Sequence, residues 1–176
     1  MIKSLKGKTP SIHPSAFIAK QAVIVGDVAI GARSSIWFNT VARGDVHHIK
    51  IGEGTNVQDN SMLHVTGGMH PLEIGDHVTI GHNAIVHGCV IKNRVLIGMG
   101  AVVLDGAEIN EESIVGAGAV VPPGFVLPSG KLAVGVPAKV ARDLTNEERE
   151  SIRTSADNYI KNSKNYMEEP DFAEGK

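Results

Sequence analysis

Residues 91–121 read IKNRVLIGMGAVVLDGAEINEESIVGAGAVV, and an aliphatic residue returns at every sixth position of this stretch. The returning residues are Ile91, Ile97, Val103, Ile109, Val115 and Val121. A small or β-branched residue stands four positions after nearly every one of them, and Gly often follows the aliphatic directly. Two coupled signals with one period predict a repeating unit of one short strand and one tight turn.

The same period extends back towards the N-terminus. Its earlier aliphatic positions are Ile12, Ile18, Ile24, Ile30, Ile36 and Ala42, then Ile51, Val57 and Leu63, then Ile74, Ile80 and Val86. Three residues are inserted before the second group, five before the third, and one is missing before Ile91. Three units make one triangular coil, and coils stack at the spacing of paired strands, about 4.8 Å. The eighteen units therefore predict an all-β solenoid of about six triangular coils with the aliphatic residues inside.

The composition agrees with a solenoid and excludes other classes. Val and Ile number 37 against 8 Leu, which excludes a helical bundle for most of the chain. Only seven aromatic residues are present, which argues against a β-sandwich with a core of large side chains. The net charge of −2 gives no basic field, so we expect no nucleic-acid partner.

We expect no membrane partner and a cytoplasmic location. No apolar run reaches the roughly 18 residues that a membrane span needs. Residues 1–10 lack the apolar stretch of a signal peptide. The single cysteine, Cys89, cannot form an internal disulfide and is interpreted as a small core residue.

The C-terminal part of the chain has a different composition, which predicts a division into a β-helix domain, 1–141, and a helix with a tail, 142–176. Prolines at 122, 123, 128 and 137 are expected to end the regular repeat. Thr145 and Glu148 form a capping box, so a helix of about 20 residues should begin there. Its apolar stripe would contain Leu144, Ile152, Ala156, Tyr159, Ile160 and Met167. The polar end, residues 168–176, is expected to be frayed.

The repeat converts positions in the sequence into positions in space. His64 and His87 each follow the third aliphatic residue of their coil, so they should stack one coil apart, with Cα atoms about 5 Å apart. Arg43 has the same position one coil earlier. Two imidazoles placed in this way can bind one metal ion at about 2.0–2.1 Å.

His82 belongs to a different column. It lies two residues after Ile80, on the second face, and Asp59 has the equivalent position one coil below. His82 is therefore poorly placed to join His64 and His87 within one subunit, but a neighbouring subunit could bring it there. A head-to-tail contact of this kind closes into a ring, and a triangular prism suits three subunits. Three imidazoles with an open fourth position are typical of a catalytic zinc site.

Four motifs carry a resemblance to a known family. They are Arg43-Gly44-Asp45, Asn56-Val57-Gln58-Asp59, Leu63-His64 and Gly81-His82-Asn83-Ala84-Ile85-Val86-His87-Gly88-Cys89. Together they resemble the gamma-class carbonic anhydrases of the hexapeptide-repeat superfamily, and the match covers essentially the whole chain. The resemblance implies a left-handed parallel β-helix and a homotrimer with three metal sites at its subunit interfaces.

The resemblance also implies roles for the site residues. One subunit would supply His64 and His87 and the next would supply His82. Gln58, with Asn56 near it, would hydrogen-bond the metal-bound water or bicarbonate. The remaining matches are Arg43 and Asp45 in intersubunit ion pairs, Asp59 nearby, and Tyr159 close to the metal. Zinc would lower the pKa of its bound water so that a hydroxide attacks carbon dioxide. Iron or cobalt also suits three imidazoles.

One departure keeps other functions open. Efficient members of the class carry a loop whose glutamates export the proton, but here residues 65–71 form only a short loop without glutamate. This argues against high turnover by a zinc-dependent lyase, unless His70 relays the proton instead of being a solvated loop residue. The alternatives are a coenzyme A-dependent acyltransferase or acyl-CoA thioesterase, and a non-catalytic metal-binding scaffold. Gln58 could instead bond across the interface, and Tyr159 could be a packing residue.

Overall fold

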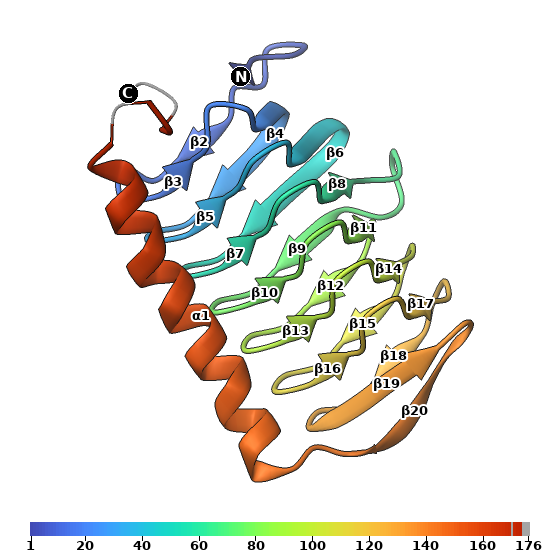
Figure 1. The fold of residues 1–176 in the computed structure, drawn as a ribbon. Coiled ribbons are helices and arrows are strands. Elements are labelled where there is room, and N and C mark those ends of the chain that lie inside the picture. The colour runs from blue at the N-terminus through green and yellow to red at the C-terminus, as the bar shows by residue number, and fades with distance from the viewer. Residues whose placement is uncertain (170, 174–176) are drawn as a thin grey trace.

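The computed structural model describes residues 1–169 and 171–173, and it is a parallel β-solenoid with one helix along its side (Figure 1). Each turn of the solenoid contributes one short strand to each of three faces. The solenoid has about seven turns, one more than the six that the sequence predicted.

Each face is a ladder of parallel strands in a fixed order. The first face contains β2 (Ser11–Ile12), the second half of β4 (Val23–Ile30), the second half of β6 (Val41–Ile51), β9 (Leu72–Ile74), β12 (Val90–Ile91), β15 (Glu108–Ile109) and β18 (Val126–Leu127). The second face contains β3 (Phe17–Ile18), β5 (Ser35–Ile36), β7 (Asn56–Val57), β10 (Thr79–Ile80), β13 (Leu96–Ile97), β16 (Ile114–Val115) and β19 (Lys131–Gly135). The third face contains β1 (Ile2–Lys3), the first halves of β4 and β6, β8 (Met62–His64), β11 (Ile85–His87), β14 (Val102–Val103) and β17 (Val120–Val121).

The repeating aliphatic residues fill the interior in the predicted register. On the third face, Ala42 pairs with Leu63 and Leu63 pairs with Val86, so both insertions leave the phase intact. All eighteen predicted positions are buried except Ile12, which is half-buried at the open end of the first face. Burial of one aliphatic side chain per unit therefore sets the period of the whole fold.

The predicted end of the repeat was wrong. Pro122 and Pro123 lie in the turn after β17, where a missing backbone N–H breaks no strand pairing. The repeat continues to Leu127, which pairs with Ile109, and to Ala133, which pairs with Val115. It ends where β20 (Ala138–Asp143) folds back antiparallel on β19. With Ile2 pairing at the N-terminal end, these residues make the additional turn.

The corner between the second and third faces needs a left-handed backbone. The residue three positions after the core aliphatic has a φ of about 60°, namely Asn39 (56°), Asn60 (61°), Asn83 (59°), Gly100 (67°) and Gly118 (66°). Asn and Gly are the residues that adopt this conformation most readily. Asn83 directly follows His82, so this corner also determines where that imidazole leaves the prism.

The helix α1 (Asn146–Met167) begins at Thr145 with the predicted capping box to Glu148. It runs back along the second face, beside β3, β5, β7 and β10, and buries Ile152 and Ala156 (Figure 1). No helix in the described part of the chain is long and apolar enough to span a membrane.

The described part of the tail is not frayed, which corrects the prediction for residues 168–176. Ala173 forms an antiparallel bridge with Ala19, and the backbone N–H of Lys20 donates to the carbonyl of Phe172 at 2.9 Å. The Phe172 ring also packs on Tyr166, with ring centroids 5.4 Å apart. Positions 170 and 174–176 lie outside the described residues. The division at residue 141 stays a prediction.

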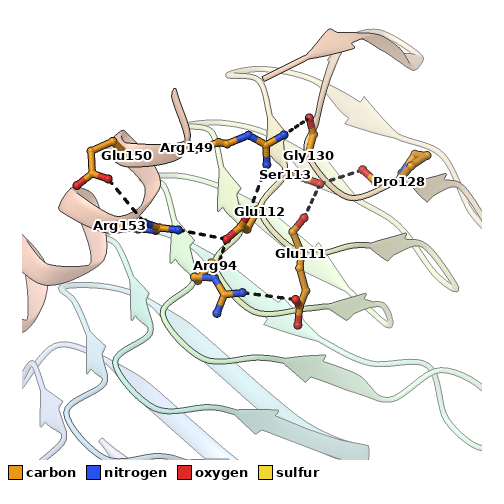
Figure 2. A network of polar contacts seen from close by, with 9 residues as sticks. All are labelled: Arg94, Glu111, Glu112, Ser113, Pro128, Gly130, Arg149, Glu150 and Arg153. Carbon is orange, nitrogen blue, oxygen red and sulfur yellow. Dashed lines mark hydrogen bonds and ion pairs between the residues drawn. The ribbon is translucent and has the colours of Figure 1, made fainter. Parts of the chain in front are cut away.

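Figure 2 shows the polar network that joins the start of α1 to the last turns of the solenoid. Glu112 is its centre and accepts from Arg94 Nε at 3.1 Å, from Arg149 Nη1 at 3.3 Å and from Arg153 Nη2 at 3.5 Å. Glu112 itself has a φ of 54°, a conformation that is unfavourable for glutamate. Its position at the corner therefore depends on the three guanidinium groups around it.

Replacement of Ile80 by Ala tests the phase of the repeat. Ile80 is fully buried, so Ile80→Ala should lower the free energy of unfolding by about 2–5 kcal/mol through the cavity it leaves. Val136→Ala, at a side chain that is 73% exposed, is the control and should change stability by no more than about 0.5 kcal/mol. Chemical denaturation measures both, and equal small effects would contradict the register.

Glu112→Gln tests the network through pH. The hydrogen bond from Arg94, followed by the charges of Arg94 and Arg153, holds the pKa of Glu112 below its usual value of 4.5. A lowered folded-state pKa contributes stability above pH 4.5 that is lost as the pH falls through the folded value. The variant should lose up to about 1 kcal/mol at pH 7, and its difference from wild type should vanish in acid. A difference that persists below pH 3 would contradict this account.

Candidate metal centre

The third face brings His64 and His87 together, as predicted. His64 ends β8 and His87 ends β11, and the two residues are direct partners in the parallel ladder. Nδ1 of His64 and Nε2 of His87 face each other at 2.9 Å. Both side chains are half-buried, with 17% and 28% of their surface exposed, so a ligand can reach them from outside.

The other ring nitrogen of each histidine contacts a carboxylate. Nε2 of His64 lies 2.9 Å from Asp45 Oδ1, and Nδ1 of His87 lies 2.5 Å from Asp105 Oδ1. An ionised carboxylate only accepts hydrogen bonds, so these two nitrogens carry protons, and in neutral imidazoles the facing nitrogens then carry lone pairs. The two facing nitrogens, 2.9 Å apart, can be bridged by a proton or by a metal cation. This donor pair therefore fits a transition metal that prefers imidazole nitrogen.

Both carboxylates stay ionised at neutral pH. Burial alone would raise the pKa of Asp45, but hydrogen bonds from His64 and Arg43 bring it below its usual value. Burial likewise acts against ionisation of Asp105, and hydrogen bonds from His87 and Thr66 again lower its pKa. Arg43 pairs with Asp45 in the same chain, at the end of the column that holds His64 and His87.

His82 lies at a different corner, as predicted, with Asp59 beneath it. Its Nδ1 is 2.8 Å from Asp59 Oδ2, which leaves Nε2 as the nitrogen with a lone pair. Within residues 1–169 and 171–173, no group of three or more His, Cys, Asp or Glu side chains is placed to hold a metal ion. One chain therefore brings together two of the three predicted ligands and leaves His82 apart.

Gln58 and Asn56 form a buried network next to His82. Gln58 Oε1 accepts from the backbone N–H of His82 at 3.2 Å, and Gln58 Nε2 donates to Asn56 Oδ1 at 3.1 Å. Asn56 in turn donates to Thr79 Oγ1 at 2.9 Å. Asn56 is 1% and Gln58 5% exposed, so only Gln58 approaches the surface.

Tyr159 reaches the same corner from α1. Its hydroxyl lies 3.5 Å from His82 Nε2, and its ring packs edge-on against Trp37 with centroids 5.4 Å apart. Burial, and secondarily the charge of Asp59, raises the pKa of Tyr159, so the phenol stays neutral at physiological pH. Its position is thus compatible with both the packing role and the site role.

Two apolar surfaces flank these histidines. A groove of about 310 Å³ lies beside His82 on the second face, and Gln58, Leu96, Met99 and Ile114 are among its lining residues. On the third face, the residue before each core aliphatic points outwards and is apolar. This outward stripe consists of Val23, Val41, Met62, Ile85, Val102 and Val120, all half-buried or exposed in the single chain. Contiguous exposed apolar surface of this kind is typical of protein interfaces.

Asp105 was missed by the sequence analysis. Asp105 belongs to neither histidine column, because it comes from the turn after β14, one coil beyond His87. Its position two residues after a core aliphatic matches that of Asp59, which was a usable signal. Cys89 is buried, and burial raises the pKa of its thiol, in agreement with its interpretation as a core residue.

Comparison with known proteins gives the family. Residues 88–123 match the family model for the bacterial transferase hexapeptide (six repeats). A carbonic anhydrase from Geobacillus kaustophilus is 48% identical over 94% of this chain and 91% of its own length. The chain belongs to the gamma-class carbonic anhydrase-like proteins of the hexapeptide-repeat superfamily.

Two further relatives show the range of labels in this family. Gamma carbonic anhydrase 1, mitochondrial, from Arabidopsis thaliana is 47% identical over 86% of this chain, which spans only 57% of that relative's length. The crystal structure of a hexapeptide transferase family protein from Anaplasma phagocytophilum has a TM-score of 0.91 and 44% identity, over 94% of this chain and 98% of that one.

Proposed function

We propose that this protein is a gamma-carbonic anhydrase-type lyase that catalyses the reversible hydration of carbon dioxide at a metal centre between subunits of a homotrimer. The observation that carries the proposal is that Nδ1 of His64 and Nε2 of His87 face each other at 2.9 Å, while a carboxylate contacts the other ring nitrogen of each histidine. His82 of the next subunit would be the third ligand. A cytoplasmic location stays a prediction.

The trimer is supported by the apolar surfaces beside the histidines. The outward stripe on the third face adjoins His64 and His87, and the apolar groove on the second face adjoins His82. Packing the stripe of one chain against the second face of the next would bury both surfaces and bring the histidines together. The two faces of one chain differ, so the contact is head-to-tail, and in the proposed trimer it closes into a ring.

Zinc is the proposed metal because three imidazoles and one open position suit it, although iron or cobalt would also fit. A bound metal ion of this kind supplies Lewis acidity that makes water a nucleophile at neutral pH. The chain's contribution is to orient the ligands. Asp45 and Asp59 each hold one ring nitrogen of a histidine, which leaves the other nitrogen free to bind.

Gln58 is proposed to bind the substrate oxygen. Its carboxamide is fixed by Asn56 and by the backbone of His82, yet one of its two N–H groups has no assigned acceptor in this network. That N–H can donate to an oxygen of carbon dioxide or bicarbonate in the adjacent groove. Asn56 is then a positioning residue for Gln58. The neutral Tyr159 hydroxyl is a second donor beside His82.

Transfer or hydrolysis of an acyl group from coenzyme A is the second candidate, favoured by the transferase label of the Anaplasma relative. A scaffold that binds metal without catalysis is the third. His70, which the sequence leaves open as either a proton relay or a solvated loop residue, lies beside Gly106 at the base of the short loop 65–71. The three functions differ in measurable activity, so hydration of carbon dioxide and hydrolysis of acetyl-CoA should be assayed on one metal-analysed sample.

Shared ligands make a sharp prediction for mixed trimers. His64→Ala and His82→Ala should each abolish metal binding and activity, while His13→Ala, at an exposed histidine whose side chain bonds its neighbour Ser15, should not. When the two inactive variants are unfolded, mixed equally and refolded, about one quarter of the interfaces combine an intact His64 with an intact His82. Metal content and carbon dioxide hydration should recover to about that fraction.

The mixture also separates the alternatives. No recovery of metal would mean that all ligands belong to one chain, which contradicts the interface. Recovery of metal without hydration of carbon dioxide would contradict the lyase, and acetyl-CoA hydrolysis by the same sample would then favour the thioesterase.

A further inference from the structure

Asp105 supplies a carboxylate to the candidate ligand His87, and it is not among the site residues that the sequence predicted. Its Oδ1 accepts from Nδ1 of His87 at 2.5 Å, and its Oδ2 accepts from the Thr66 hydroxyl at 2.7 Å. Both carboxylate oxygens are therefore used, one for the histidine and one for the loop that follows His64. The Asp105 side chain is 31% exposed. Solvent does not fix its orientation, so the two hydrogen bonds do.

The repeat is modified at the place where Asp105 reaches His87. The unit from Val86 to Ile91 has five residues instead of six, and the missing residue falls in the corner directly after His87. Gly88 turns this shortened corner with a φ of 50°. A Cβ on Gly88 would lie 2.4 Å from Asp105 Oδ1 and 2.8 Å from His70 Cβ, so any other residue here would displace the carboxylate or the loop from this position.

Thr66 joins the same arrangement to the loop. The backbone of Thr66 pairs with His70 in a small hairpin that follows β8, and the Thr66 hydroxyl reaches Asp105 from this hairpin. Thr66 is two residues after His64, so one carboxylate connects the segments that carry both histidines. The shortened unit, the corner at Gly88 and the Thr66–His70 hairpin all lie next to the Asp105 carboxylate.

We propose that Asp105 is a positioning residue for the metal centre, which fixes the ring of His87 with Nε2 towards His64, and that Thr66 holds the carboxylate in place. This inference rests on the proposed function. A histidine ligand whose second nitrogen donates to a carboxylate has a fixed tautomer and a more basic binding nitrogen. The residue acts through His87 and needs no contact with the substrate.

The test is the affinity of the purified protein for zinc and cobalt, measured by competition with a chelator. Asp105→Ala should weaken binding about 10- to 100-fold. Asp105→Asn keeps an oxygen that accepts from Nδ1 but loses the charge, so its loss should be smaller. Thr66→Val keeps the volume and removes only the hydroxyl, so it should weaken binding in the same direction. Glu108→Gln, in β15 three residues after Asp105, is the control and should bind as wild type does.

The visible spectrum of the cobalt-loaded protein provides a second readout. Asp105→Ala should change the absorption bands of the bound cobalt, because the ring of His87 is no longer fixed. The stability of the metal-free protein against unfolding should change much less than its metal affinity. If Asp105→Ala does not fold, Asp105→Asn and Thr66→Val decide the question. If these variants bind metal with wild-type affinity while His64→Ala loses its metal, the role of Asp105 is overturned and the proposed function stands. A wild-type protein without metal affinity would overturn the proposed function as well.

Discussion

Parallel pairing between successive turns is the interaction on which the rest of this structure depends. It fixes each residue against the equivalent residue one turn away, as Leu63 is fixed against Val86. A slip by one position would expose every core aliphatic on that face, so burial enforces the register. The two insertions in the sequence therefore project from the prism, one as the bulge in β6 and the other as the loop 65–71, and they leave the register unchanged.

The functional consequence of this register is a set of histidines that are each oriented by a carboxylate from a neighbouring turn. Asp45, Asp59 and Asp105 have this relation to His64, His82 and His87 respectively. The same register that aligns His64 with His87 keeps His82 at another corner. A single chain thus brings together two of the three proposed ligands, and under the proposed function a second copy would supply the third.

Much of this was predictable from the sequence because the solenoid has only nearest-turn contacts. The period predicted the core, the stacking of His64 on His87 and the separation of His82, and the capping box predicted the start of α1. The errors lie where periodicity carries no information. Pro122 and Pro123 occupy turns rather than strand interiors, so the repeat passes through them. Asp105 has the same repeat position as Asp59, but its contact with His87 crosses the shortened corner, which the period does not describe. Phe172 was missed because its contacts are with the first turns, far away in sequence.

The central claim is that the metal centre is made by two chains, and anomalous scattering measured at the absorption edge of the metal in crystals of the metal-loaded protein tests it most directly. The account predicts one strong peak at each subunit boundary of a trimer, between Nδ1 of His64 and Nε2 of His87 of one chain and within bonding distance of Nε2 of the neighbouring chain's His82. A peak bound by residues of a single chain, or no peak at the paired histidines, would contradict it.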